Sequence, residues 1–241
     1  MEVIRKLSEK SRNINGKPAV TIAFLGDSVT QGCFEVYTTE TGGIETVFDA
    51  ENAYHTHLRK ILNTLFPAAA LNIINAGISG GCAPGGLERI ERDVLRYSPD
   101  MCVVCFGLND TGNYGIEEYK TALTGIFDRL LKEGVEVIFM TPNMMCTKLS
   151  CHIKEENIRK IGEDILNNQV SGKLEQYLEA AKEIAVSKNI PVCDCYSKWK
   201  MLEKSGVDTT ELLANHLNHP TRDMNWLFAY SLVETMFKNY R

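Results

Sequence analysis

Residues 20–32 read Val20-Thr-Ile-Ala-Phe-Leu-Gly-Asp-Ser-Val-Thr-Gln-Gly32, a short apolar run that ends in a Gly-Asp-Ser turn. A continuous apolar run of this length is typical of a strand buried on both faces, as in a parallel sheet. Later parts of the chain repeat the pattern, and most of these runs stop at a glycine or a proline. The further predicted strands are 71–76, 101–106, 135–141 and 190–195.

Helical patterns separate these predicted strands. Apolar residues recur at three- and four-residue spacing, as on one face of an amphipathic helix, and Gly134 terminates one of the helices as a C-cap. Alternating strands and helices predict an α/β fold in which a parallel, doubly wound, five-stranded sheet lies between two helical layers. We find no linker or repeat, so we expect a single domain over residues 1–241. The predicted helices are 53–65, 87–97, 116–133, 174–187 and 224–237.

The overall composition is that of an ordinary globular protein. Apolar residues make up 44% of the 241 residues and charged residues 24%, and the net charge is −5. No basic block stands out, which argues against nucleic-acid binding. No apolar run approaches the roughly 20 residues that span a bilayer. The first ten residues carry charges where a secretory leader would need its apolar region.

The cysteine pattern favours free thiols in a reducing compartment. Cys102 and Cys105 have the spacing of a metal or redox pair. Because neighbouring side chains of a strand point to opposite faces, these two thiols are expected to face opposite ways. We find no paired ligand spacing of a structural zinc site and expect neither metal nor cofactor. The prediction is a cytoplasmic protein with buried, unpaired cysteines.

Three predicted strands end in groups that suit acyl transfer. Ser28 follows the first strand, Gly80 lies in the glycine-rich Asn75–Gly81 turn after the second, and Asn109 follows the third. Taken singly, each is better explained as a turn or a helix cap. Taken together, they bring a hydroxyl, an unshielded backbone amide and a carboxamide to one edge of the sheet. These are the nucleophile and oxyanion donors that acyl transfer requires, and His219, before the last helix, can supply the base.

These blocks resemble the GDSL/SGNH hydrolase family, in order and at fitting intervals. Gly26-Asp27-Ser28 is similar to its first block, Gly80 to the glycine of its second, Asn109 to the asparagine of its third and His219-Pro220 to its last. The resemblance implies a flavodoxin-like sandwich and ester hydrolysis without a cofactor. It further implies that Ser28 is the nucleophile and His219 the general base, with Gly80 and Asn109 at the oxyanion.

The family pattern places an aspartate three residues before the catalytic histidine, and this chain has His216 there. A histidine cannot supply the negative charge that orients and stabilises the imidazolium. Three alternatives remain open. A backbone carbonyl orients His219 and leaves a Ser–His dyad, a distant carboxylate such as Asp208 or Asp223 completes a triad, or the enzyme is weak or inactive.

The resulting prediction is a carboxylic ester hydrolase that acts on small acyl groups. By analogy with family members that lack lipid-binding features, an acylated sugar is the favoured small-molecule substrate. The alternatives are a lysophospholipase or thioesterase, and a non-catalytic carbohydrate-binding protein that keeps the fold. Residues 32–52 and 142–157 are irregular in sequence and are expected to lie near the site. The oligomeric state is left open.

Overall fold

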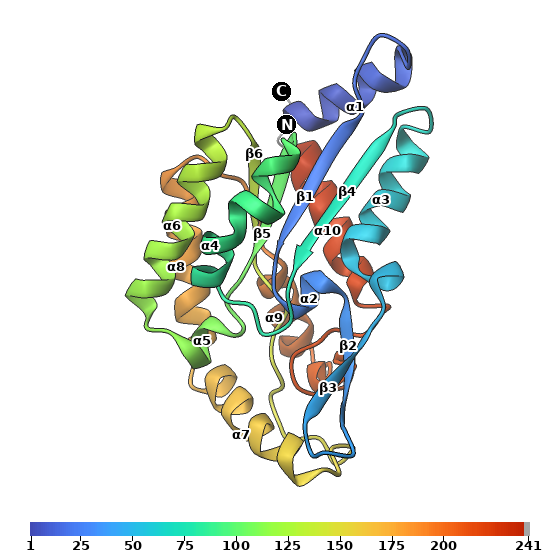
Figure 1. Ribbon diagram of the computed structural model, residues 1–241. Coiled ribbons are helices and arrows are strands. Elements are labelled where there is room, and N and C mark those ends of the chain that lie inside the picture. The colour runs from blue at the N-terminus through green and yellow to red at the C-terminus, as the bar shows by residue number, and fades with distance from the viewer. Residues whose placement is uncertain (239–241) are drawn as a thin grey trace.

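A computed structural model of the chain describes residues 1–238 and shows a three-layer α/β/α arrangement (Figure 1). The central sheet has five parallel strands in the order β4-β1-β5-β6-β7. Numbered along the chain, this is the 2-1-3-4-5 order of flavodoxin-like folds. The predicted parallel five-stranded sheet is confirmed. The strands are β1 (Val20–Gly26), β4 (Leu71–Gly77), β5 (Met101–Cys105), β6 (Glu136–Met140) and β7 (Val192–Cys193).

Helices cover both faces of the sheet, and each face has its own apolar core. Side chains of β1 and β5 alternate between the two cores, so that Cys105 belongs to one and Cys102 to the other. The prediction that these two thiols face opposite ways is therefore correct. One face is covered by α4 (Ala83–Asp93), α6 (Ile116–Lys132) and α8 (Lys173–Ser187), and the other by α1 (Glu2–Arg12), α3 (Tyr54–Leu65), α9 (Cys195–Lys204) and α10 (Asn225–Lys238).

Two predicted elements have different bounds in the structure. The last predicted strand is reduced to β7, because Pro191 has no N–H to donate and Asp194 caps the start of α9. The predicted helix at 87–97 instead begins at Ala83 with a proline in its first turn and ends at Asp93, before the short 3₁₀ helix η2 (Leu95–Tyr97).

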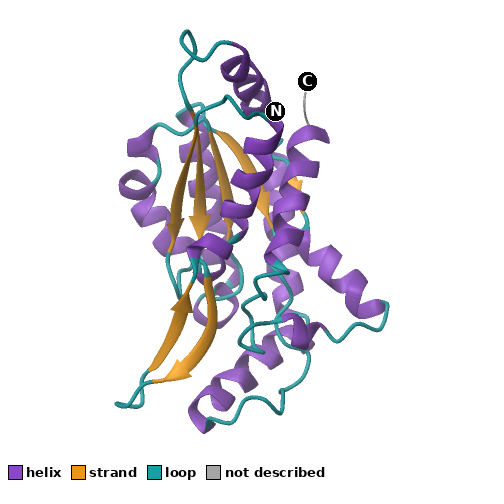
Figure 2. Ribbon diagram, turned by 90° about the vertical axis from the view of Figure 1, so that its right-hand side faces the viewer, coloured by secondary structure: helices purple, strands orange, loops and turns teal. Residues whose placement is uncertain are grey.

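Two elements that were not predicted project beyond the carboxyl ends of the strands. The first is an antiparallel hairpin formed by β2 (Cys33–Thr38) and β3 (Ile44–Phe48), and the second is α7 (Glu156–Val170). Figure 2 shows the hairpin below the central sheet. The hairpin strands form a separate two-stranded sheet and are not hydrogen-bonded to the five central strands. The Thr38 N–H donates to Glu155 at 3.0 Å, and the Thr38 hydroxyl lies 3.1 Å from Asn157, so hairpin and helix are joined.

The remaining short elements lie in the connections. None of the helices within residues 1–238 combines the length and the apolar character that crossing a bilayer demands. The short elements are α2 (Ser28–Gln31), η1 (Ala50–Asn52), α5 (Asp110–Asn113) and η3 (Thr209–Leu212).

Candidate active site

The structure brings all four predicted site residues to one cavity at the carboxyl edge of the sheet. Ser28, Gly80, Asn109 and His219 line a hollow of about 320 Å³. They come from segments up to 191 residues apart, since that is the separation of Ser28 and His219. The topology of the parallel sheet accounts for this convergence, because the carboxyl ends of β1, β4 and β5 meet there.

Ser28 is held by a tight turn between β1 and α2. A side chain at Gly26 would place its Cβ 2.7 Å from the Cys105 carbonyl oxygen, so only glycine permits this close approach of the strands. Asp27 caps α2 by accepting the Val29 N–H at 2.9 Å. Ser28 begins α2, and its own N–H therefore has no acceptor within the helix. Its side chain is almost fully buried.

His219 lies in a loop that Asn215 organises. The Asn215 side-chain oxygen accepts the backbone N–H groups of Leu217, Asn218 and His219 at 2.9–3.0 Å. Asn143 adds a further support by donating to the Asn218 carbonyl at 2.8 Å. These hydrogen bonds fix the loop, which directs the His219 ring toward the end of β1.

The His219 ring bridges the Ser28 hydroxyl and a backbone carbonyl. Its Nε2 lies 2.9 Å from Ser28 Oγ, and its Nδ1 lies 2.8 Å from the Phe34 carbonyl oxygen in β2. Because a carbonyl only accepts, Nδ1 must carry the proton in this contact. The neutral ring therefore offers its Nε2 lone pair to the serine hydroxyl, which is the arrangement of a general base.

No carboxylate within residues 1–238 forms a hydrogen bond or an ion pair with His219. Asp208 instead pairs with Lys148 and caps η3 by accepting the Thr210 N–H at 3.2 Å. Asp223 is exposed at the start of the last helical segment, where its carbonyl accepts the Trp226 N–H at 3.1 Å. Neither of the two carboxylates considered as a distant acid reaches the ring.

His216, at the position where the family pattern has aspartate, faces different partners. Its ring stacks on His152 with 5.1 Å between centroids, and its Nδ1 lies 3.8 Å from Glu211. Its backbone has φ of 55°, a left-handed conformation that is uncommon for residues other than glycine. The side chain at position 216 is thus directed to Glu211 and His152.

The two predicted oxyanion donors, Gly80 and Asn109, also line the cavity. Gly80 has φ of 73° and is exposed, with open space where a side chain would be. The Asn109 amide donates one hydrogen to the Gly81 carbonyl at 3.0 Å. Because a carboxamide has two N–H donors, this bond fixes the group and leaves a second hydrogen available.

Two buried aspartates, Asp27 and Asp110, brace the turns next to Ser28 and Asn109. Asp110 accepts the Ala83 N–H at 2.8 Å and the Gly107 N–H at 3.0 Å, and thereby ties α4 to the end of β5. Burial raises the pKa of Asp110 to about 6. Burial, together with the nearby Asp110 charge, raises the pKa of Asp27 to about 7, against the opposing effect of the Val29 N–H.

Burial also controls the protonation of His219. Desolvation lowers the pKa of the imidazole to about 4, while the hydrogen bond to Phe34 and the charge of Glu35 act in the opposite direction. The ring is therefore neutral at physiological pH and is ready to accept a proton.

Aliphatic side chains form most of the remaining cavity wall, together with the polar Ser79, Asn215 and Asn218. None of the described lining residues is Phe, Tyr, Trp, Asp, Glu, Lys or Arg. The hairpin and α7 supply most of this apolar surface, which sequence reasoning had only placed near the site. The aliphatic lining residues are Val36, Ile44, Ile158, Ile161, Ile165 and Leu217.

The sequence did not predict which residue supplies the carbonyl that contacts His219. A backbone carbonyl was one of the predicted alternatives, but nothing in the sequence singles out Phe34, since every residue carries a carbonyl. The Ile158, Ile161 and Ile165 spacing of α7 was a signal that could have revealed this wall of the cavity.

Comparison with known proteins places this geometry in a family. The profile of the GDSL-like lipase/acylhydrolase family matches residues 24–227. An acetylxylan esterase of Geobacillus stearothermophilus is 24% identical over 132 residues, which cover 50% of this chain and 58% of that protein. The match thus spans little more than half of this curated relative.

Solved structures of similar fold include two esterases of carbohydrates. A two-domain esterase active on acetylated mannans superposes with a TM-score of 0.69 at 20% identity, covering 98% of this chain and 52% of that one. A catalytic mutant of an acetylxylan esterase from Geobacillus stearothermophilus gives 0.67 at 18% identity, covering 91% and 95%. At these identities the likeness concerns the fold, while the profile match extends over most of the sequence. The chain belongs to the GDSL-like lipase/acylhydrolase family.

Proposed function

We propose that this protein is a serine esterase in which Ser28 and His219 form a catalytic dyad. The observation that carries the proposal is the continuous contact from the Phe34 carbonyl through the His219 ring to the Ser28 hydroxyl, at 2.8 and 2.9 Å. Nucleophile and base lie within hydrogen-bonding reach, and the base is oriented by a third group, as nucleophilic catalysis requires.

The proposed reaction has two stages. Ser28 Oγ attacks the ester carbonyl carbon while its proton passes to His219 Nε2, and the tetrahedral intermediate expels the alcohol, which takes that proton. Water then attacks the acyl-enzyme and gives a proton to Nε2. Collapse releases the carboxylic acid and returns the proton to Ser28. The backbone N–H groups of Ser28 and Gly80 and the second hydrogen of the Asn109 amide are the proposed oxyanion donors.

A small acyl ester of a carbohydrate is the proposed substrate. Family membership and the carbohydrate esterases among the fold neighbours support this choice. The exposed Gly80 and Ser79 leave one side of the cavity open, which leaves space for a bulky, polar alcohol.

One observation favours a second candidate function. The six aliphatic residues of the cavity wall form a surface that suits an acyl chain longer than acetyl, as in a lysophospholipase or thioesterase. Each additional buried methylene is worth about 0.8 kcal/mol. A series of p-nitrophenyl esters from acetate to decanoate separates the candidates, since a sugar deacetylase should be fastest on acetate and the alternative on a longer chain.

The decisive experiment compares the wild type with Ser28→Ala on p-nitrophenyl acetate and on acetylated xylan and mannan. The proposal expects hydrolysis by the wild type and its loss in Ser28→Ala, together with covalent labelling of Ser28 by a serine-directed organophosphonate. Binding of the polysaccharide without hydrolysis by either protein would instead support the non-catalytic carbohydrate-binding alternative.

A further inference from the structure

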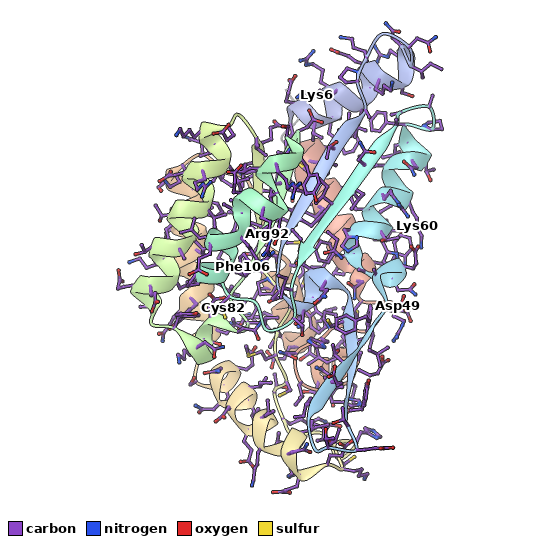
Figure 3. The ribbon with its side chains drawn as sticks, in the orientation of Figure 1. Lys6, Asp49, Lys60, Cys82, Arg92 and Phe106 are labelled. Carbon is purple, nitrogen blue, oxygen red and sulfur yellow. The ribbon has the colours of Figure 1, made fainter. Side chains whose placement is uncertain are left out.

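Arg222 connects the histidine loop to the hairpin. It lies three residues after His219, and its guanidinium group makes two contacts with Glu35, at 2.6 and 3.1 Å. Its Nε donates to Asp49 at 2.8 Å. Figure 3 shows Asp49 beside the base of the hairpin, just after β3.

The same guanidinium group also covers the ring of Phe34, at 4.3 Å from its centroid. Phe34 supplies the carbonyl that accepts the His219 Nδ1–H. Arg222 therefore contacts the side chains of Phe34, Glu35 and Asp49. These contacts involve both residues of the Phe34–Glu35 peptide unit, whose carbonyl orients the imidazole.

We propose that Arg222 is the positioning residue of the dyad, because it holds the Phe34 carbonyl in contact with His219 Nδ1, the role that the family pattern gives to a carboxylate. This inference rests on the proposed esterase function for its kinetic consequences. Its structural consequence, the orientation of His219, does not depend on activity.

The hairpin needs such a support at this point. The register between β2 and β3 shifts between Cys33 and Val36, which is where Phe34 and Glu35 lie. The hairpin is not hydrogen-bonded into the five-stranded sheet, so the main ladder does not fix the Phe34 carbonyl. A carbonyl lacks the charge by which a carboxylate attracts an imidazolium, so its effect depends on its position. A displacement of about 1 Å can cost roughly a hundred-fold in rate.

Arginine suits this role better than lysine. The planar guanidinium binds both carboxylate oxygens of Glu35, reaches Asp49 through a third nitrogen and stacks on an aromatic ring. A lysine has one ammonium group and cannot make these contacts together. The Arg222 side chain is also 36% exposed, so the contacts gain their value from geometry more than from charge alone.

The kinetic test uses Arg222→Met and Arg222→Lys, with Arg129→Met as the matched control. Arg129 donates to Glu91 at 2.8 Å between α6 and α4, away from the site, so its loss removes an equally charged ion pair. We expect kcat on p-nitrophenyl acetate to fall at least about tenfold in Arg222→Met, with KM within threefold. Arg222→Lys should fall nearly as far, and Arg129→Met should match the wild type.

The second test observes His219 directly by NMR of protein labelled with ¹⁵N-histidine, assigned with His219→Gln. In the wild type the ring should be the Nδ1-protonated tautomer, with an Nδ1–H protected from exchange by burial. In Arg222→Met we expect mixed tautomers and faster exchange of this proton. Glu35→Gln keeps the arginine, weakens the two-oxygen contact and removes the Glu35 charge, so it should show a smaller change of the same kind.

Each outcome decides the proposal. An Arg222→Met variant with kcat within threefold of the wild type and an unchanged Nδ1–H signal would overturn it. A raised KM at constant kcat would do so as well, because it would make Arg222 a substrate-binding residue. If Arg222→Met does not fold, Glu35→Gln with unchanged kcat and signal overturns it. Failure of the esterase proposal is recognised separately, by activity that persists in Ser28→Ala, and leaves the NMR result valid.

Discussion

At the scale of single residues, the site combines a strongly held histidine with an uncharged orienting group. The His219 Nδ1–H bonds to the Phe34 carbonyl, so no anion in contact stabilises the imidazolium. The sequence showed that the acid of the family pattern was missing, since His216 occupies its position. It could not show which carbonyl takes over, because that depends on where the hairpin lies in space.

The first prediction concerns the pH dependence of catalysis. Since desolvation lowers the pKa of His219 to about 4, the base is neutral over most of the usable pH range. For p-nitrophenyl acetate, kcat/KM should rise with pH in the region of pH 4 and be constant from pH 6 to 8. A pH–rate profile measures this rise of kcat/KM at acid pH. An acid limb centred well above pH 6.5 would contradict the dyad, because a pKa above the unperturbed imidazole value would point to an anion that favours the cation.

The second prediction concerns the carboxylates. His216→Asp should leave kcat within about threefold, because the new carboxylate would face Glu211 and not His219. Asp208→Asn and Asp223→Asn should have equally small effects, since neither residue contacts the ring. A gain of tenfold in His216→Asp, or a loss of a hundred-fold in either asparagine variant with the fold intact, would mean that a carboxylate reaches His219 during turnover.

The third prediction concerns the oxyanion. Asn109→Ala should lower kcat by roughly a hundred- to a thousand-fold, the usual effect of removing one such donor. KM should change little, because the hydrogen bond strengthens only as charge develops on the substrate oxygen. Asn72→Ala, an exposed residue near the opposite end of β4, serves as the control. An increase in KM at normal kcat would assign Asn109 to ground-state binding.

At the scale of elements, the sheet was far more predictable than its surroundings. Continuous apolar runs such as Val20–Gly26 are typical of buried strands, and they were recognised. The hairpin was missed because four of the five residues of Ile44–Phe48 are exposed, and only Thr46 is intermediate. These residues therefore lack the alternation of apolar and polar side chains that marks a strand with one buried face. The helix α7 was also missed, although Ile158, Ile161 and Ile165 recur in it at helical spacing.

The fourth prediction concerns the wall that these two elements form. Ile161→Asp should lower kcat/KM for p-nitrophenyl hexanoate by about tenfold, which corresponds to losing the burial of about two methylenes. The value for the acetate should stay within threefold, because an acetyl group does not extend to α7. Val170→Asp, on the same helix but outside the cavity and 63% exposed, is the matched control. Equal losses on both esters would show that the wall does not contact the acyl chain.

At the scale of the whole molecule, the site imposes a cost on the stability of the fold. Asp27 and Asp110 are buried where β1 and β5 end, and burial raises their pKa values to about 7 and 6. In the unfolded chain an aspartate has a pKa near 3.9. Between about pH 4 and pH 7 these two carboxyl groups therefore bind more protons in the folded protein than in the unfolded chain. Their contribution to stability is greatest below that window and falls as pH rises through it.

The fifth prediction follows from this linkage. Asp27→Asn keeps an oxygen that can accept the Val29 N–H but has no proton to release. Its free energy of unfolding, relative to that of the wild type, should therefore increase between pH 5 and pH 8, by up to about 1.4 kcal/mol per pH unit while Asp27 titrates. Urea unfolding at both pH values measures this difference, and the titration of buried His219 cancels because both proteins contain it. Asp128→Asn, at a carboxyl with 57% exposure, should show no comparable change. If the Asp27→Asn difference is the same at pH 5 and pH 8, Asp27 does not titrate in this range, and its pKa is not raised to about 7.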